Sequence, residues 1–182
     1  MKKLTEKVLS SHIVFKGNFL QVIRDEVELS NGHKSFREYI KHAGAAMVIP
    51  LVAPDKVLMI HQYRHSVGQI FLEFPAGKCD PGESTLQTAA RELQEEVGLR
   101  AGRLTYLSHI HPVIGYSNER IDLFLAEDLE SVPQTLDPDE MLVQEEVSIK
   151  DLETKIWNSE ITDVKTQIGA QWLSRYLQNK NK

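Results

Sequence analysis

One amphipathic helix with clearly marked ends, set between segments of β character, is the feature that most limits the fold of this chain. Ser84 is a favoured N-cap residue, and Gln87 completes a capping box with it. Gly98 suits the position just after the end of a helix. The sequence therefore predicts a helix between these ends. Apolar residues at helical spacing predict its buried stripe: Leu86, Ala90, Leu93 and Val97.

The segments around this helix favour an α/β layered fold with a mixed sheet. Asn31-Gly32 is a strong hairpin signal between the expected strands 18–29 and 36–40. Further strands are expected at residues 43–51, 56–61, 71–75, 104–110 and 121–125, and further helices at 151–157 and 161–177. The last helix is expected to pack through Ile168, Trp172, Leu173 and Leu177. We expect an N-terminal β-hairpin subdomain over residues 1–42 and a main domain over 43–182. Because a hairpin is too small for its own core, it must pack on the main body or on a second copy.

Composition and charge restrict the class of protein. Of 182 residues, 41% are hydrophobic and 26% are charged, as in an ordinary globular domain. A net charge of -5 argues against general nucleic-acid binding, which relies on basic residues. The chain has no apolar run long enough to span a membrane and no secretory signal at its start. We therefore expect a cytoplasmic protein without a membrane or nucleic-acid partner.

Three glutamates on the central helix indicate a metal site. Glu92, Glu95 and Glu96 lie at positions i, i+3 and i+4, on one side of the helix and largely clear of the apolar stripe. Their mutual repulsion is a cost that a hard divalent cation can offset. The alternative is a solvated acidic face. The glycine-containing loop before the helix favours the metal site, as does a possible pair between Arg91 and Glu83 that ties loop to helix.

The segment from Gly77 to Leu99 resembles the Nudix box at every specified position. It reads Gly-x5-Glu-x7-Arg-Glu-Leu-x-Glu-Glu-x-Gly-Leu. The resemblance implies a Nudix α/β/α sandwich with a mixed sheet, and hydrolysis of a nucleoside diphosphate linked to another moiety. It also implies Mg²⁺ as cofactor, with Mn²⁺ possible. The metal ligands carried over by position are the carboxylates of Glu92, Glu95 and Glu96 and the backbone carbonyl of Ala76.

Further motifs resemble the branch of this family that contains ADP-ribose pyrophosphatases and nucleoside diphosphate sugar hydrolases. They are Arg37-Glu38, His42–Ala45, Gln62–Arg64, Glu73–Lys78 and Gly115–Arg120. By position, the resemblance implies substrate-binding roles for Arg37, Arg64 and Glu119, with Glu73 a weaker candidate. For each arginine the alternative is a surface ion pair. The branch also implies a homodimer with exchanged N-terminal strands. Pro112 lies two residues earlier than the branch places its proline, which keeps nucleotide sugars other than ADP-ribose open.

The expected reaction is attack by water on one phosphorus of the pyrophosphate, giving a nucleoside monophosphate and a sugar phosphate. The branch takes its general base from a loop after the box, and Glu140 is the first choice here, followed by Asp139 and Asp137. Glu95 is the alternative base, and all three loop acids could instead be solvated. The alternative function is a Nudix hydrolase that acts on a dinucleoside polyphosphate or NADH. The base and sugar of the substrate, and the number of metal ions, stay open.

Overall fold

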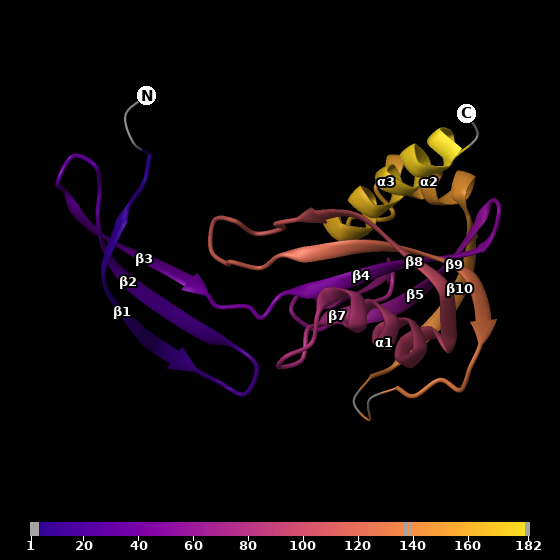
Figure 1. Cartoon of the computed structure of the whole chain (residues 1–182), viewed down its shortest axis with the longest axis horizontal. Coiled ribbons are helices and arrows are strands. Elements are labelled where there is room, and N and C mark those ends of the chain that lie inside the picture. The colour runs from indigo at the N-terminus through magenta and orange to yellow at the C-terminus, as the bar shows by residue number, and fades with distance from the viewer. Residues whose placement is uncertain (1–3, 137, 139, 181–182) are drawn as a thin grey trace. The chain divides into compact units, whose positions relative to one another are not determined.

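The computed structural model describes residues 4–136, 138 and 140–180, and the chain forms two compact units (Figure 1). One unit comprises Met1–Ala43 together with Val113–Arg120. The other comprises Gly44–Pro112 and Ile121–Lys182. No sequence signal had joined the segment 113–120 to the N-terminal strands.

The N-terminal unit is a three-stranded antiparallel sheet in the order β1-β2-β3. Its strands are β1 Lys7–Lys16, β2 Gln21–Glu28 and β3 Lys34–Ile40. The expected hairpin is present between β2 and β3, and Gly32 has a φ of 82° in its turn. The segment 113–120 joins this unit through backbone and side-chain hydrogen bonds. Ile40 N–H donates to the carbonyl of Tyr116 at 2.8 Å, and His42 N–H donates to Asn118 Oδ1 at 2.7 Å.

The second unit is built on a mixed seven-stranded sheet. Five strands follow the order β10-β5-β4-β9-β8, while β6 pairs with β5 and β7 with β4. The β4–β9 pair is parallel, and the remaining pairs are antiparallel. The bounds are β4 Ala45–Ala53, β5 Lys56–Arg64, β6 Gln69–Glu73, β7 Ala76–Lys78, β8 Leu99–Ile110, β9 Ile121–Ser131 and β10 Leu142–Ser148.

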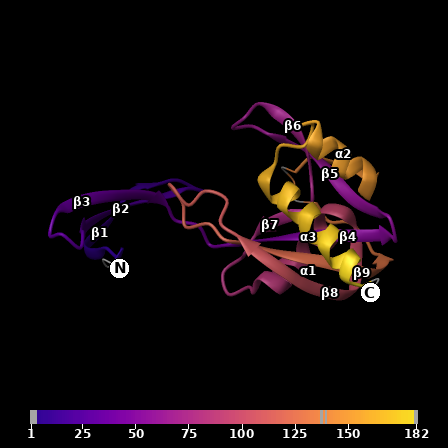
Figure 2. The same ribbon diagram turned by 90° about the horizontal axis from the view of Figure 1, so that it is seen from above.

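Helices cover both faces of this sheet, so the expected α/β/α sandwich is confirmed (Figures 1 and 2). Helix α1, Thr85–Val97, covers one face; α2, Ile149–Trp157, and α3, Val164–Lys180, cover the other. Strand β4 serves both layers because its side chains alternate. Ala46 and Val48 belong to the core under α1, whereas Met47 and Ile49 belong to the core under α3.

Both predicted ends of α1 are confirmed. Ser84 and Gln87 form the reciprocal capping box, and Gly98 takes the left-handed conformation with a φ of 64°. The predicted buried stripe is wrong in its first half, because Leu86 and Ala90 are exposed. The row that faces the sheet is instead Ala89, Leu93 and Val97, one residue earlier at its start. This rotation of the helix also places two of the glutamates on the buried side.

The predicted core contacts of α3 are partly wrong for a similar reason. Leu173 is fully buried, and Ile168 and Leu177 pack at the margin of the core, but Trp172 is substantially exposed. The helix approaches β4 through Gly169, where a Cβ atom would come within 2.5 Å of Met47 Cε. The small residues Gly169 and Ala170 therefore face the sheet, and Trp172, which the sequence predicts to be in the core, does not. In the described part of the chain, no helix is long and apolar enough to cross a membrane.

Candidate active site

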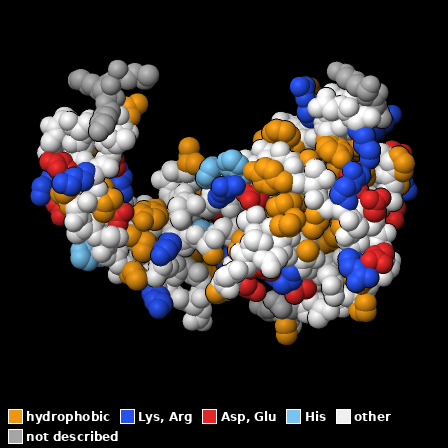
Figure 3. Space-filling view, in the orientation of Figure 1, with side chains coloured by type: hydrophobic (Ala, Val, Ile, Leu, Met, Phe, Trp, Pro, Cys, Tyr) orange, Lys and Arg blue, Asp and Glu red, His pale blue; other side chains and the backbone are white. Residues whose placement is uncertain are grey.

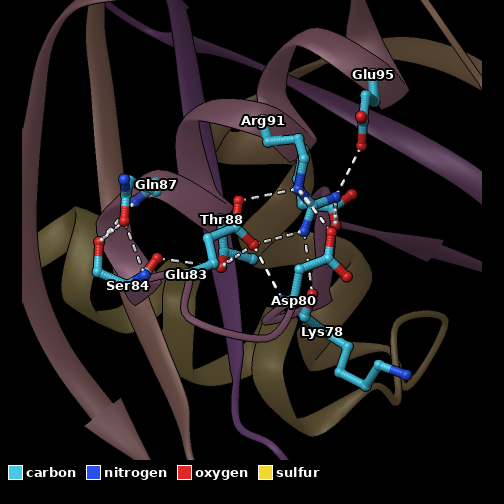
Figure 4. A network of polar contacts seen from close by, with 9 residues as sticks. Lys78, Asp80, Glu83, Ser84, Gln87, Thr88, Arg91 and Glu95 are labelled. Carbon is cyan, nitrogen blue, oxygen red and sulfur yellow. Dashed lines mark hydrogen bonds and ion pairs between the residues drawn. The ribbon is translucent and has the colours of Figure 1, made fainter.

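Arg91 joins the loop before α1 to the helix itself, as the sequence predicts (Figure 4). Its Nε and Nη2 donate to the two carboxylate oxygens of Glu83 at 3.1 and 3.0 Å. Nη2 also donates to the carbonyl of Lys78 at 3.0 Å. Hydrogen bonds from Arg91 lower the pKa of Glu83 to about 2. The loop therefore holds a fixed charge pair that anchors it to the first turns of α1.

The same guanidinium bridges two glutamates of the helix. Nη1 of Arg91 donates to Glu92 Oε1 at 2.7 Å and to Glu95 Oε2 at 2.8 Å. Figure 4 shows the Glu95 side chain directed toward Arg91. A cation placed between two carboxylates offsets much of their repulsion. The acidic cluster of the helix is thus held in place by one arginine.

Glu92 and Glu96 lie against the loop backbone and are nearly excluded from solvent. Glu92 is 6% exposed and Glu96 is 1% exposed. Glu96 Oε2 accepts a hydrogen bond from Ala76 N–H at 2.9 Å. A Cβ atom on Gly77 would lie only 1.7 Å from Glu92 Oε1, so only glycine permits this approach. The sequence had placed the glutamates clear of the buried face, and for these two that expectation is wrong.

Burial makes the ionised forms of these two carboxyl groups unfavourable. Desolvation raises the pKa of Glu92 to about 7, against the opposing effect of Arg91. Desolvation, followed by the charges of Glu92 and Glu140, raises the pKa of Glu96 to about 8. A nearby cation would favour the ionised form of both. Positive charge in addition to that of Arg91 would therefore stabilise the ionised forms of Glu92 and Glu96.

The donor set fits a hard divalent cation. Carboxylate and carbonyl oxygens are the ligands that Mg²⁺ and Mn²⁺ take in proteins, and Glu92, Glu96 and the Ala76 backbone lie beside one another. Within residues 4–136, 138 and 140–180, no three His, Cys, Asp or Glu side chains gather as ligands of a single metal ion. Glu95 and Glu92 both accept hydrogen bonds from Nη1 of Arg91, so this guanidinium lies between their carboxylates.

Arg64, at the end of β5, lies close enough to Glu96 for their charges to interact. Its positive charge lowers the pKa of Glu96, and the charge of Glu96 in turn raises the pKa of Arg64. The larger effect on Arg64 is its pair with Glu73 of β6: Nε and Nη2 donate to the two carboxylate oxygens at 2.8 and 2.7 Å. Glu73 is 2% exposed, which favours a role in holding Arg64 over direct contact with a substrate.

Glu140 lies close enough to the helix for its charge to raise the pKa of both Glu92 and Glu96. The other two candidate bases, Asp137 and Asp139, lie outside the described residues. Two glutamines connect this part of the chain to α1. Gln134 Nε2 donates to the carbonyl of Glu96 at 2.6 Å, and Gln144 Nε2 approaches the same carbonyl at 3.4 Å.

The remaining predicted site residues, Arg37 and Glu119, belong to the N-terminal unit. Arg37 forms a two-pronged ion pair with Glu6, with Nε to Oε2 at 3.0 Å. Glu119 lies 3.6 Å from His42 Nε2. Each therefore has a partner inside its own unit, and their roles toward a substrate stay predictions.

Sequence reasoning missed three residues around the site: Lys165, Gln134 and Gln144. Lys165 is 8% exposed and binds Glu73, a residue 92 positions earlier in the chain. The two glutamines reach back 38 and 48 positions to Glu96. No local spacing could reveal such contacts, because they depend on where α3, β10 and the segment between β9 and β10 lie in the fold.

Comparison with known proteins matches this architecture in both units. Residues 41–165 match the model of the NUDIX domain, and residues 6–40 match the nucleoside diphosphate sugar hydrolase N-terminal domain. The chain is 35% identical to the ADP-ribose pyrophosphatase of Bacillus subtilis, over 95% of each chain. It is 34% identical to the methanol dehydrogenase activator of Bacillus methanolicus, over 94% of each.

Two further likenesses concern ADP compounds hydrolases. The Escherichia coli protein named ADP compounds hydrolase NudE is 32% identical to the chain, over 77% of this chain and 76% of the relative. A crystal structure of an ADP compounds hydrolase superposes with a TM-score of 0.88, covering 99% of this chain and 98% of the other, at 24% identity. That structural likeness supports the fold. With the Nudix box on α1 and a family match over most of its length, the chain belongs to the Nudix hydrolase family, in the branch that carries the nucleoside diphosphate sugar hydrolase N-terminal domain.

Proposed function

We propose that this protein hydrolyses the pyrophosphate of ADP-ribose, or of a related nucleoside diphosphate sugar, to a nucleoside monophosphate and a sugar phosphate. One observation carries the proposal: the buried carboxylate of Glu96, beside Glu92, lies near enough to both Glu140 and Arg64 for their charges to act on its pKa. A site that combines acidic metal ligands, a further carboxylate and an arginine suits cleavage of a phosphoanhydride. The full-length likeness to a protein named ADP-ribose pyrophosphatase supports the choice of substrate.

Glu92, Glu95 and Glu96, with the carbonyl of Ala76, would hold Mg²⁺ or Mn²⁺. A bound cation neutralises phosphate charge and lowers the pKa of a coordinated water. Arg91 ties the loop to the helix through its two hydrogen bonds to Glu83, so that the ligands remain fixed relative to one another. Gly77 is required because any side chain there would displace Glu92.

The substrate and the water are handled by the chain's other charged groups. Arg64 donates hydrogen bonds to a phosphate oxygen, because a guanidinium matches the geometry of that anion. Glu140 accepts the proton of the attacking water as the new phosphorus–oxygen bond forms. The bridging phosphorus–oxygen bond then breaks, and one phosphate monoester leaves. The roles of Arg37 and Glu119 in binding the substrate form part of the same proposal.

The experiment that tests this function is a substrate screen with purified protein and Mg²⁺. Alkaline phosphatase releases inorganic phosphate only from the monoester products, so phosphate reports cleavage of the pyrophosphate. We expect the highest kcat/KM with ADP-ribose or another nucleoside diphosphate sugar. In EDTA, where alkaline phosphatase is itself inactive, cleavage is followed by chromatography of the nucleoside monophosphate, and we expect none. A clear preference for NADH or diadenosine polyphosphates would reject the proposed substrate class.

Replacing Glu140 tests the proposed base. We expect Glu140→Gln to lower kcat by about 10²–10⁴-fold while KM changes little, because general-base catalysis contributes about that factor. Glu146→Gln is the matched control. Glu146 follows on β10, and its carboxylate is exposed and pairs only weakly with Lys56 at 3.5 Å, so kcat should be unchanged. Near-normal kcat in the Glu140 variant would move the base to Asp139 or Glu95.

The proposal includes a homodimer formed through the N-terminal strands. The N-terminal unit exposes several large apolar side chains, some of which are visible in Figure 3. They include Val8, Ile13, Val14, Phe15 and Phe36, all more than half exposed. Apolar patches of this kind often mark contacts between proteins. Light scattering should give twice the mass of one chain at micromolar concentration, and the mass of a single chain would exclude the dimer.

A further inference from the structure

Glu73 holds Arg64 from below the surface of the main unit. Its carboxylate is 2% exposed and receives two parallel hydrogen bonds, from Nε and Nη2 of Arg64. This is the bidentate geometry that fixes a guanidinium most firmly. The Arg64 side chain keeps 39% of its surface exposed. Among the residues that the structure describes, its Nη1 donates no hydrogen bond, so this nitrogen can reach a ligand.

A second cation, Lys165, shares the same carboxylate. Its Nζ donates to Glu73 Oε2, the oxygen that also binds Arg64 Nη2, and to Asp163 Oδ2 at 2.9 Å. Burial alone would raise the pKa of Asp163, but the charge of Lys165 and hydrogen bonds from Thr166 outweigh burial and lower it. The carboxylates of Glu73 and Asp163 and the cations of Arg64 and Lys165 therefore form one group with no net charge.

The first turn of α3 is fastened to the chain where this group lies. Asp163 Oδ2 accepts from Thr166 N–H at 3.0 Å, as a helix N-cap does. Thr166 Oγ1 in turn accepts from Phe74 N–H at 3.1 Å, one residue after Glu73. The position of Lys165 relative to Glu73 is thus set by a second, independent hydrogen bond.

We infer that Lys165 is a positioning residue for substrate binding, which acts through Glu73 on Arg64. Without its ammonium, Glu73 and Asp163 would present two negative charges to Arg64 alone. Arg64 would then be drawn further into the protein and its charge more fully neutralised. With Lys165 in place, the negative charge of Glu73 is shared between Lys165 and Arg64. Arg64 then keeps its orientation, and enough positive charge is left on it to attract an anionic ligand. The inference rests on the proposed function, because the ligand of Arg64 is taken to be the pyrophosphate.

A purely structural role for Lys165 makes a different prediction, and Lys180 provides the comparison. Lys180 lies at the other end of α3 and binds a buried carboxylate, with Nζ to Glu127 Oε1 at 2.7 Å. Replacing either lysine with methionine removes an ion pair between α3 and the sheet. Both variants should lower the melting temperature. Only Lys165→Met should also alter substrate binding.

The experiment is a double-mutant cycle on steady-state kinetics with ADP-ribose, or with the best substrate from the screen. We expect Lys165→Met to raise KM about tenfold with little change in kcat, as when one charge-assisted hydrogen bond to the substrate weakens. Lys180→Met should leave KM unchanged. Because Lys165 acts through Arg64, the double variant Arg64→Met/Lys165→Met should have the KM of Arg64→Met alone.

Glu73→Gln keeps the inference testable if Lys165→Met folds poorly. The amide has nearly the same shape as the carboxylate but cannot accept both charge-assisted hydrogen bonds that orient Arg64. KM should therefore rise, and the effect should again vanish in the absence of Arg64. An unchanged KM in a folded Lys165 or Glu73 variant would overturn the inference. So would additive effects with Arg64→Met. Neither result would disturb the proposed function, which depends on turnover by the unaltered protein.

Discussion

The burial of two carboxyl groups against the backbone of a short loop is the constraint on which the site depends. Glu92 and Glu96 are nearly inaccessible to water, and burial raises the pKa of each. An isolated buried carboxylate is costly, and the fold tolerates these two because Ala76 N–H and Arg91 bind them. The remaining cost is the physical reason to expect a cation here. Glutamates are normally exposed in globular domains. Here two of them are buried, and a bound metal ion would lower the cost of ionising them.

The layers of the main unit bring the other charged groups to these carboxylates. Strands β5 and β6 deliver Arg64 and Glu73 as a bonded pair, and β7 supplies Ala76 beside α1. Helix α3 lies on the opposite face of the sheet from α1, and its Lys165 binds Glu73, the partner of Arg64. Both helical layers therefore contribute to one electrostatic network. This arrangement explains how a residue outside the box motif can influence the binding of an anion.

Much of the fold could be predicted because its signals are local. The capping box at Ser84, Gly98, the hairpin at Asn31-Gly32 and the Arg91–Glu83 pair all depend on residues near one another in sequence. The rotation of α1 and the exposure of Trp172 could not be read in the same way. They are set by the contacts of each helix with the sheet, where Ala89 and Gly169 allow closer packing than larger residues would. The role of Lys165 could not be predicted either, because its partner Glu73 is remote in the sequence.

Calorimetric titration of Mg²⁺ into metal-free protein at pH 7 tests the central claim most directly. The titration is repeated in buffers of different ionisation enthalpy, which reveals protons released on binding. Because the pKa values of Glu92 and Glu96 are raised to about 7 and about 8, these groups are partly protonated at pH 7 and must ionise to bind a cation. We expect release of about one proton per bound ion, with binding strongly weakened by Glu96→Gln. Tight binding without proton release, unchanged in that variant, would contradict it.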